Sequence, residues 1–192
     1  MTHPDPFDPT YGYDLDRLLM VLPPQAPEDF ADFWTLKYRQ ALEVNPTLAL
    51  APSADQRPGM RVWDCRYRST DGITIGGWLL EPEHSPPQRG FVVGHGYGGI
   101  EQPDFPLPCA DAAYLVPCFR GIGRSRHAPI SDNPIWHVLH DIDKPDRYII
   151  GGCVQDLWVA VSALLTRFPQ LSGRISYMGI SFGGGIGALA LP

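Results

Sequence analysis

The sequence predicts an α/β fold in which the short buried strands of a mostly parallel sheet alternate with flanking helices. Residues 91–93 and 112–119 are compact apolar runs, typical of buried strands. Residues 151–168 carry apolar side chains at helical spacing. Residues 175–187 pass from a short apolar run through a sharp glycine-flanked turn into small residues that can begin a helix. Alternation of this kind indicates a sheet covered by helices.

Length and composition predict a single globular core. The chain has 192 residues, and 44% of them are apolar, which is enough for one domain. The net charge of -6 comes from 15 basic and 21 acidic residues without a basic stripe. Nucleic acid is therefore not an expected partner.

No membrane partner, metal or export signal is expected either. No run approaches the roughly 18 to 20 apolar residues of a membrane span, and the start of the chain lacks the pattern of a signal peptide. A cytoplasmic location is the resulting expectation. The four cysteines lack C-x-x-C spacing, which predicts reduced thiols rather than a metal site: Cys65, Cys109, Cys118 and Cys153.

The first 50 residues are expected to form an extension and a helix that packs on the main domain, residues 51–192. Residues 1–26 are rich in proline and aspartate and are expected to run extended, with the leucines at positions 15, 18, 19 and 22 as candidates to anchor a short turn. Pro27, followed by two acidic residues, is typical of a helix start. Large apolar residues then recur at spacings of three and four, which predicts an aromatic face against the core: Phe30, Phe33, Trp34, Tyr38 and Leu42.

Between this helix and the first buried strand, the sequence predicts a linker and a hairpin. The linker is rich in proline and alanine. Residues 61–68 and 73–81 are typical of two strands joined by a short turn, and hence of an antiparallel pair. Farther along, residues 127–147 form a long irregular passage that is expected to carry surface loops.

The stretch with recognisable chemistry is Gly179-Ile180-Ser181-Phe182-Gly183. The pattern G-x-S-x-G between a strand and a helix is a nucleophile elbow, a strained turn that exposes a serine hydroxyl. The turn brings strand and helix too close for a Cβ at position 179 or 183. Ser181 is therefore the candidate nucleophile, although the pattern alone also occurs by chance in glycine-rich chains.

A second motif, His95-Gly96-Tyr97-Gly98-Gly99, supports this interpretation because it directly follows a buried strand. Attack by a serine creates an oxyanion, which needs preorganised donors. In the α/β-hydrolase fold one donor is the N–H of the residue after the nucleophile, and the other comes from the loop after the third strand. We expect the backbone N–H groups of Phe182 and Tyr97 to form this oxyanion hole.

From about Tyr13 to Leu191 the sequence resembles the acetyl xylan esterase and cephalosporin C deacetylase family of α/β-hydrolases. The resemblance rests on five stretches: residues 26–34, 76–82, 95–99, 120–123 and 179–185. It implies that Ser181 is the nucleophile and that the N–H groups of Tyr97 and Phe182 form the oxyanion hole. It also implies deacetylation of small esters, including acetylated xylo-oligosaccharides, with no metal or organic cofactor, and homo-hexamers for full-length members.

The chain departs from the family pattern at several positions. Phe182 and Ile122 stand where the family usually has glutamine, and residues 147–152 replace a run rich in tyrosine and arginine. Phe182 is expected to make the pocket more apolar. In this fold the acid and the histidine follow the serine, whereas the sequence ends at Pro192. The expectation is an α/β-hydrolase domain truncated after the elbow, and a chain that is inactive as an esterase by itself.

None of the six histidines is expected to replace the missing base. His95 is expected to shape the oxyanion loop. His137 and His140 lie beside two aspartates in a proline-bounded loop, which is expected at the surface. A metal pair, or a base with its orienting acid, is the less favoured interpretation of that group. The remaining histidines are expected at the surface: His3, His84 and His127.

Two other kinds of function stay open at this point: another hydrolase activity on the same fold, and binding without catalysis. The fold is equally compatible with a serine peptidase or a dienelactone-type hydrolase, since fold does not determine function. A non-catalytic protein that binds a ligand or partner through a hydrolase-like cleft is the alternative from another functional class.

Overall fold

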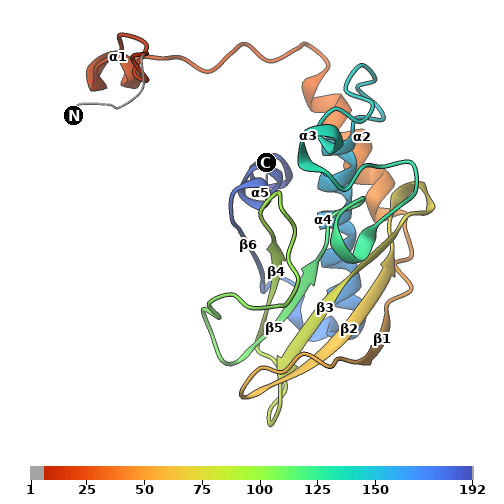
Figure 1. The fold of residues 1–192 in the computed structure, drawn as a ribbon. Coiled ribbons are helices and arrows are strands. Elements are labelled where there is room, and N and C mark those ends of the chain that lie inside the picture. The colour runs from red at the N-terminus through yellow and green to blue at the C-terminus, as the bar shows by residue number, and fades with distance from the viewer. Residues whose placement is uncertain (1–6, 192) are drawn as a thin grey trace. The chain divides into compact units, whose positions relative to one another are not determined.

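The computed structural model describes residues 7–191, and the chain divides after residue 33 into two units (Figure 1). His3 and the start of the expected extension lie outside the described residues. The larger unit begins at Trp34, so residues 34–50 group with the main part of the chain. The expected boundary at residue 50 stays a prediction.

Among its described residues, the smaller unit contains the short helix α1 (Leu15–Leu19) and the first turn of α2 (Phe30–Leu42). The Asp14 carboxylate accepts a hydrogen bond from the backbone N–H of Arg17 at 2.9 Å, which caps the helix start. Upstream of it, hydrogen bonds from Thr10 and Gly12 lower the pKa of Asp8. The short turn expected at the leucines of this segment is thus present as α1, which is capped by Asp14 and has no buried residue.

The larger unit is built on one mixed sheet of six strands in the order β1-β2-β3-β5-β4-β6. The strands are β1 (Ala49–Pro52), β2 (Met60–Arg68), β3 (Thr74–Pro82), β4 (Arg89–Gly94), β5 (Ala112–Pro117) and β6 (Ile175–Gly179). Strand β4 pairs in parallel with β5 and β6, whereas the pairs β1–β2, β2–β3 and β3–β5 are antiparallel. The expectation of a mostly parallel sheet is therefore wrong for the described residues. Strand β3 runs antiparallel to β5, and through this pair the hairpin joins one side of the parallel part, β5-β4-β6.

The predicted hairpin is confirmed, and the predicted linker is partly wrong. Strands β2 and β3 pair in register from Met60 with Pro82 to Arg68 with Thr74, and a turn at residues 70–72 joins them. Strand β1 lies in the segment expected to be a linker and adds to the outer edge of β2. Its four residues are mostly exposed, so it shows no alternation of buried and exposed positions that a sequence pattern could reveal.

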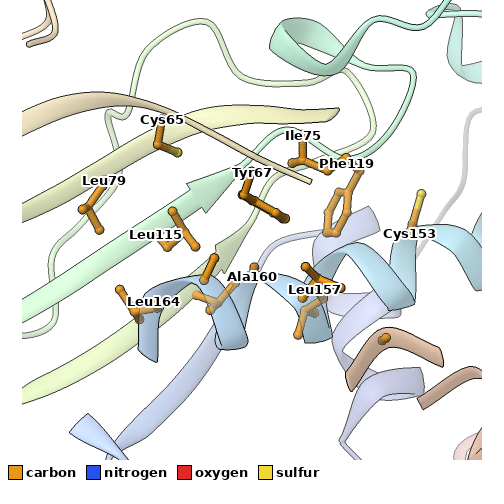
Figure 2. Packing of buried hydrophobic residues seen from close by; sticks show 14 of the residues in the cluster. Cys65, Tyr67, Ile75, Leu79, Leu115, Phe119, Cys153, Leu157, Ala160 and Leu164 are labelled. Carbon is orange, nitrogen blue, oxygen red and sulfur yellow. The ribbon is translucent and has the colours of Figure 1, made fainter. Parts of the chain in front are cut away.

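Four helices accompany this sheet: α2 (Phe30–Leu42), α3 (Pro134–His137), α4 (Ile149–Arg167) and α5 (Phe182–Ala190). Helix α4 is the central one, since it is buried along most of its length. Figure 2 shows Leu157, Ala160 and Leu164 of α4 pointing toward side chains of the sheet, Tyr67 and Leu115 among them. The predicted amphipathic helix at residues 151–168 is thus confirmed and forms one wall of the core.

Helix α4 is also the one helix in residues 7–191 that is long and apolar enough to cross a membrane. Most of this helix is buried inside the fold. The core helix of an α/β unit meets the same criterion.

The face that α2 presents to α4 differs in part from the expected aromatic stripe. Trp34 and Tyr38 pack edge-on against Trp158, with ring centroids 6.3 and 5.1 Å apart. The most buried side chains of α2, however, are Lys37 and Ala41. The Lys37 ammonium donates to the carbonyl of Asp146 at 2.8 Å. The helix therefore docks through a mixed face, and Leu42, which was expected to be buried, is exposed.

Candidate active site

Ser181 lies at the apex of the turn between β6 and α5, and its side chain is exposed. Its backbone angles are φ 52° and ψ -114°, a conformation that residues with a Cβ rarely adopt. Such conformations cost about 1 to 3 kcal/mol and persist where the surrounding structure enforces them. Here the chain must leave β6 and enter α5 within two residues, Ile180 and Ser181.

The two glycines of the turn have the predicted steric role. A Cβ on Gly179 would lie 2.6 Å from the carbonyl carbon of Gly183, and a Cβ on Gly183 would overlap the carbonyl oxygen of Gly94. The N–H of Gly183 also donates to the carbonyl of His95 at 2.9 Å. Helix α5 is thus pressed against the end of β4, and the elbow lies directly beside the loop that follows this strand.

The loop after β4 brings Tyr97 next to the elbow. Gly96, Tyr97, Gly98 and Gly99 form a tight turn, closed by a hydrogen bond from the N–H of Gly99 to the carbonyl of Gly96 at 3.0 Å. A Cβ built on Gly96 would lie 4.0 Å from the Cβ of Ser181. The side chain of Tyr97 packs edge-on against Phe182, with ring centroids 4.1 Å apart. The three residues predicted to form the site are therefore neighbours.

The two backbone N–H groups expected to bind an oxyanion are both unengaged within residues 7–191. Phe182 is the first residue of α5, and the first N–H groups of a helix have no intrahelical acceptor. The N–H of Tyr97 lies in the turn and donates to no acceptor in the described residues. Free N–H groups at a helix N-terminus favour a negative charge. Their role as an oxyanion hole stays a prediction.

The Phe182 side chain forms part of an aromatic cluster behind the elbow. Its ring lies edge-on to Phe119, with centroids 5.3 Å apart, as well as to Tyr97. Ile122, the second residue that replaces a family glutamine, is also buried. Phe182 therefore places an apolar ring directly beside Ser181, in contact with Tyr97 and Phe119.

His95 has both ring nitrogens engaged. Its Nε2 accepts the backbone N–H of Phe119 at 3.1 Å, which means that the proton sits on Nδ1, 2.6 Å from the carbonyl of Gly96. Burial lowers the pKa of this imidazole. His95 therefore ties the Tyr97 loop to the end of β5 and is not free to accept the proton of Ser181.

His137 contradicts the expectation of a surface histidine. It ends the short helix α3 and is fully buried. Its Nε2 lies 2.8 Å from the carbonyl oxygen of Arg120, and its Nδ1 lies 2.8 Å from the hydroxyl of Tyr97. Burial also lowers the pKa of His137. A polar sequence environment predicted exposure, but the protein provides a partner for each ring nitrogen, which makes the burial possible.

The other polar residues of this loop do not form a metal site. Asp141 accepts hydrogen bonds from Lys144 and Arg147, which lower its pKa to about 2. No group of three or more potential metal ligands occurs among the residues that the structure describes. His84 and His127 are exposed, as expected.

A buried ion pair supports the loop that follows β5. The Arg120 guanidinium donates to both oxygens of Asp156, from Nε at 3.0 Å and from Nη2 at 2.8 Å, and the backbone N–H of Arg120 binds the same carboxylate at 3.1 Å. A Cβ on Gly152 would lie 2.5 Å from Nη1 of Arg120. This network fixes the backbone whose carbonyl holds His137.

The sequence analysis missed two residues, Tyr177 and Asp156. Tyr177, in β6, extends under α5, and its hydroxyl donates to the carbonyl of Gly183 at 2.5 Å. A Cβ on Gly187 would overlap the ring of Tyr177. The glycine spacing in 183–187 was a usable signal that a large side chain lies below the helix. Asp156 lies within the predicted helix, and nothing in its sequence context distinguished it from an acidic residue on the solvent-exposed face.

Comparison with known proteins agrees with this geometry. Residues 15–191 match the sequence profile of acetyl xylan esterase (AXE1). The chain belongs to the acetyl xylan esterase (AXE1) family. Since the match covers nearly all of the described residues, the family assignment includes both the elbow and the Tyr97 loop.

Solved structures show the same fold. Acetyl xylan esterase from Paenibacillus sp. R4 has a TM-score of 0.72 at 23% identity, over 93% of this chain and 60% of that one. Acetyl xylan esterase 1 from Thermoanaerobacterium sp. JW/SL YS485 has a TM-score of 0.68 at 20% identity, over 86% of this chain and 54% of that one. A more distant match is the acylaminoacyl peptidase from Pyrococcus horikoshii, with a TM-score of 0.50 at 21% identity, over 69% of this chain and 21% of that one. The chain thus spans between half and two thirds of the length of the two esterases.

Proposed function

We propose that the protein carries the nucleophile and the oxyanion hole of a serine esterase that removes acetyl groups from small esters, such as acetylated xylo-oligosaccharides. The observation that carries the proposal is the strained, exposed Ser181 beside two unengaged N–H groups, those of Phe182 and Tyr97. Membership of the AXE1 family supports an acetyl ester as the substrate.

The proposed reaction begins with Ser181. Its Oγ forms a bond to the ester carbonyl carbon as a base takes the hydroxyl proton, and the carbonyl π electrons move to the oxygen. The N–H groups of Phe182 and Tyr97 bind this oxyanion. Collapse of the intermediate breaks the bond to the alcohol oxygen, which leaves with a proton, and water then hydrolyses the acetyl-serine to acetate. Loss of one oxyanion donor typically lowers the rate about a hundredfold to a thousandfold.

No side chain accepts a hydrogen bond from the Ser181 hydroxyl among residues 7–191, so the structure assigns no base to it. All six histidines precede Ser181 in the sequence, whereas the base of this fold follows its serine. The two histidines near the elbow, His95 and His137, use both ring nitrogens for other contacts. We therefore expect this chain on its own to have little esterase turnover.

Chemical rescue tests the proposal. The purified chain and its Ser181→Ala variant are compared on p-nitrophenyl acetate with and without added imidazole, which serves as an external base. We expect a low rate without imidazole and an imidazole-dependent increment in the wild-type chain above that of Ser181→Ala. Mass spectrometry should find the acetyl group on the peptide that contains Ser181. Equal rates for the two proteins under all conditions, with no acetylated peptide, would refute the proposal.

The same proteins discriminate the alternative functions. Labelling of Ser181 by a fluorophosphonate, followed by a panel of acetyl esters and peptide amides in the presence of imidazole, separates an esterase from a serine peptidase on this fold. A cyclic enol ester added to that panel would be the preferred substrate of a dienelactone-type hydrolase. Absence of any label on a folded chain would instead favour a non-catalytic binding protein.

A further inference from the structure

His137 connects two parts of the larger unit that lie far apart in the sequence. It comes from the irregular passage between β5 and α4, yet it is fully buried against the Tyr97 loop and the Arg120 backbone. Helix α3 also holds His137 in place. The Asn133 side chain caps the start of this helix, and the Asn133 carbonyl accepts a hydrogen bond from the N–H of His137 at 2.8 Å.

The hydrogen bonds of His137 have a defined direction. The carbonyl oxygen of Arg120 can only accept, so the Nε2 of His137, 2.8 Å away, carries the proton. In the neutral ring Nδ1 is then an acceptor, and the Tyr97 hydroxyl, 2.8 Å away, is the donor. Burial lowers the pKa of His137 and so favours this neutral form. The geometry therefore predicts the Nε2–H tautomer of His137, which can be measured.

The contact with Tyr97 bears directly on the candidate oxyanion hole. The rings of His137, Tyr97 and Phe182 are mutually edge-on, with centroid distances of 5.4 Å for His137 to Tyr97, 6.3 Å for His137 to Phe182 and 4.1 Å for Tyr97 to Phe182. Two of these three residues carry the proposed donors.

The Tyr97 loop needs such support because its backbone is poorly constrained by its own sequence. Gly96, Gly98 and Gly99 surround Tyr97, and glycine gives a backbone more conformational freedom than any other residue. A Cβ on Gly98 would meet nothing within 4 Å. The side chain of Tyr97 anchors the middle of the turn, whereas His95 holds its start through the Gly96 carbonyl. A misplacement of about 1 Å in a catalytic group can lower a rate by about a hundredfold.

We propose that His137 is a positioning residue, which holds the Tyr97 side chain by a hydrogen bond and ring contacts and thereby aims the backbone N–H of Tyr97 toward the oxyanion position beside Ser181. The role in catalysis rests on the proposed function. Arg120 and Asp156 belong to the same support, since their ion pair fixes the carbonyl that orients the His137 ring.

Nuclear magnetic resonance of the full chain tests the positioning independently of any reaction. The ring nitrogens of His137 should show the Nε2–H tautomer, and Tyr97→Phe should shift the Nδ1 signal because its donor is lost. Tyr97→Phe and His137→Phe should both move the backbone amide signals of Tyr97 and Phe182 and speed amide exchange at Gly99. His84→Phe, at an exposed histidine, is the control and should leave these signals unchanged.

The reactivity of Ser181 gives the second readout. In buffer with imidazole, we expect Tyr97→Phe and His137→Phe to react with a fluorophosphonate about tenfold to a hundredfold more slowly than the wild-type chain. The two effects should not add in full in the double variant, because both substitutions remove the hydrogen bond between Tyr97 and His137. Tyr97→Phe removes only a hydroxyl and keeps the assay informative if His137→Phe does not fold.

The outcomes separate this inference from the proposed function. An Nδ1–H tautomer, or unchanged amide signals and exchange in Tyr97→Phe, would overturn the positioning role whether or not Ser181 reacts. Unreactive Ser181 in every protein, together with the expected tautomer and amide changes, would refute the esterase proposal and with it the catalytic purpose of the positioning. Changed amide signals with an unchanged rate would overturn the inference alone.

Discussion

Ser181 has an unfavourable backbone conformation, and it is the residue of the turn whose side chain can act as a nucleophile. Glycine adopts φ 52° without the steric cost that a Cβ brings. We expect Ser181→Gly to raise the free energy of unfolding by about 1 kcal/mol, since relief of strain exceeds the added entropy of the unfolded chain. Urea denaturation measures this change.

Ser181→Ala is the matched control for that measurement. It removes the hydroxyl but keeps the Cβ, so its stability should remain close to that of the wild-type chain. If Ser181→Gly were no more stable than Ser181→Ala, the strain argument at this position would be wrong. We therefore expect Ser181→Gly to be more stable than the wild-type chain but to lack the nucleophile.

The burial of His95 and His137 predicts that the free energy of unfolding depends on pH. Burial lowers the pKa of both rings below the ordinary value of 6.5. Below that pH the unfolded chain takes up protons that the folded chain does not, so the free energy of unfolding should fall as the pH drops from about 7.5 to about 5.5. The contribution is fully present above the unfolded pKa.

Denaturation series at several pH values test this dependence with two variants. His137→Gln removes one of the buried titrating groups, and the slope between about pH 7.5 and pH 5.5 should become shallower. His84→Gln should leave the slope unchanged, because the His84 ring is exposed to water in the folded chain as well. A slope that is the same in all three proteins would contradict the assignment of neutral buried histidines.

Single residues also mark the limit of what the sequence predicts about the site. The spacing of small residues around Ser181 and the loop at Tyr97 predicted two segments that the structure brings side by side. His137 was not predicted, because its burial depends on acceptors and donors that come from Tyr97 and Arg120. Such long-range partners leave no local pattern.

At the scale of elements, the glycines of α5 differ sharply in their surroundings. A Cβ on Gly183 would overlap the carbonyl oxygen of Gly94, whereas a Cβ on Gly185 would meet nothing within 4 Å. Gly183→Ala should lower the free energy of unfolding by about 1 to 3 kcal/mol through overpacking. Gly185→Ala should raise it by about 0.5 to 1 kcal/mol, because alanine is the better helix former.

The pair is a controlled test, since both changes add one methyl group to the same helix. Thermal or urea denaturation of the two variants gives the comparison. Equal effects would mean that α5 is not pressed against the end of β4 as the structure has it.

The elements themselves were predictable to different degrees. Strands β2, β3, β4 and β6 and helix α4 carry strong local patterns, and their predicted bounds lie within a few residues of those observed. The antiparallel pairing of β3 with β5 was not predictable, because the strands are separated in sequence by β4 and meet only in the assembled sheet. Strand β1 was missed because its exposed residues leave no periodicity.

At the scale of the whole larger unit, the sheet ends in two strands that have one neighbour each, β1 and β6. Strand β1 has four residues and ends in a proline, features that limit pairing at an edge. Strand β6 is about as short, with five residues, but it contains no proline. It pairs only with β4 among the described residues, and its side chains are exposed or half-buried.

An unprotected edge strand is a template for pairing with another chain, so we expect the purified protein to self-associate through β6. Ser176 is an exposed residue within β6, and Ser172 is an exposed residue just outside it. Ser176→Lys should shift the protein toward monomer in sedimentation velocity over a range of concentrations, because a lysine on an edge strand opposes pairing. Ser172→Lys adds the same charge and should change the distribution little. A wild-type chain that remains monomeric and unfolds cooperatively at all concentrations would contradict the prediction, and equal effects of the two lysines would assign the association to net charge rather than to the β6 edge.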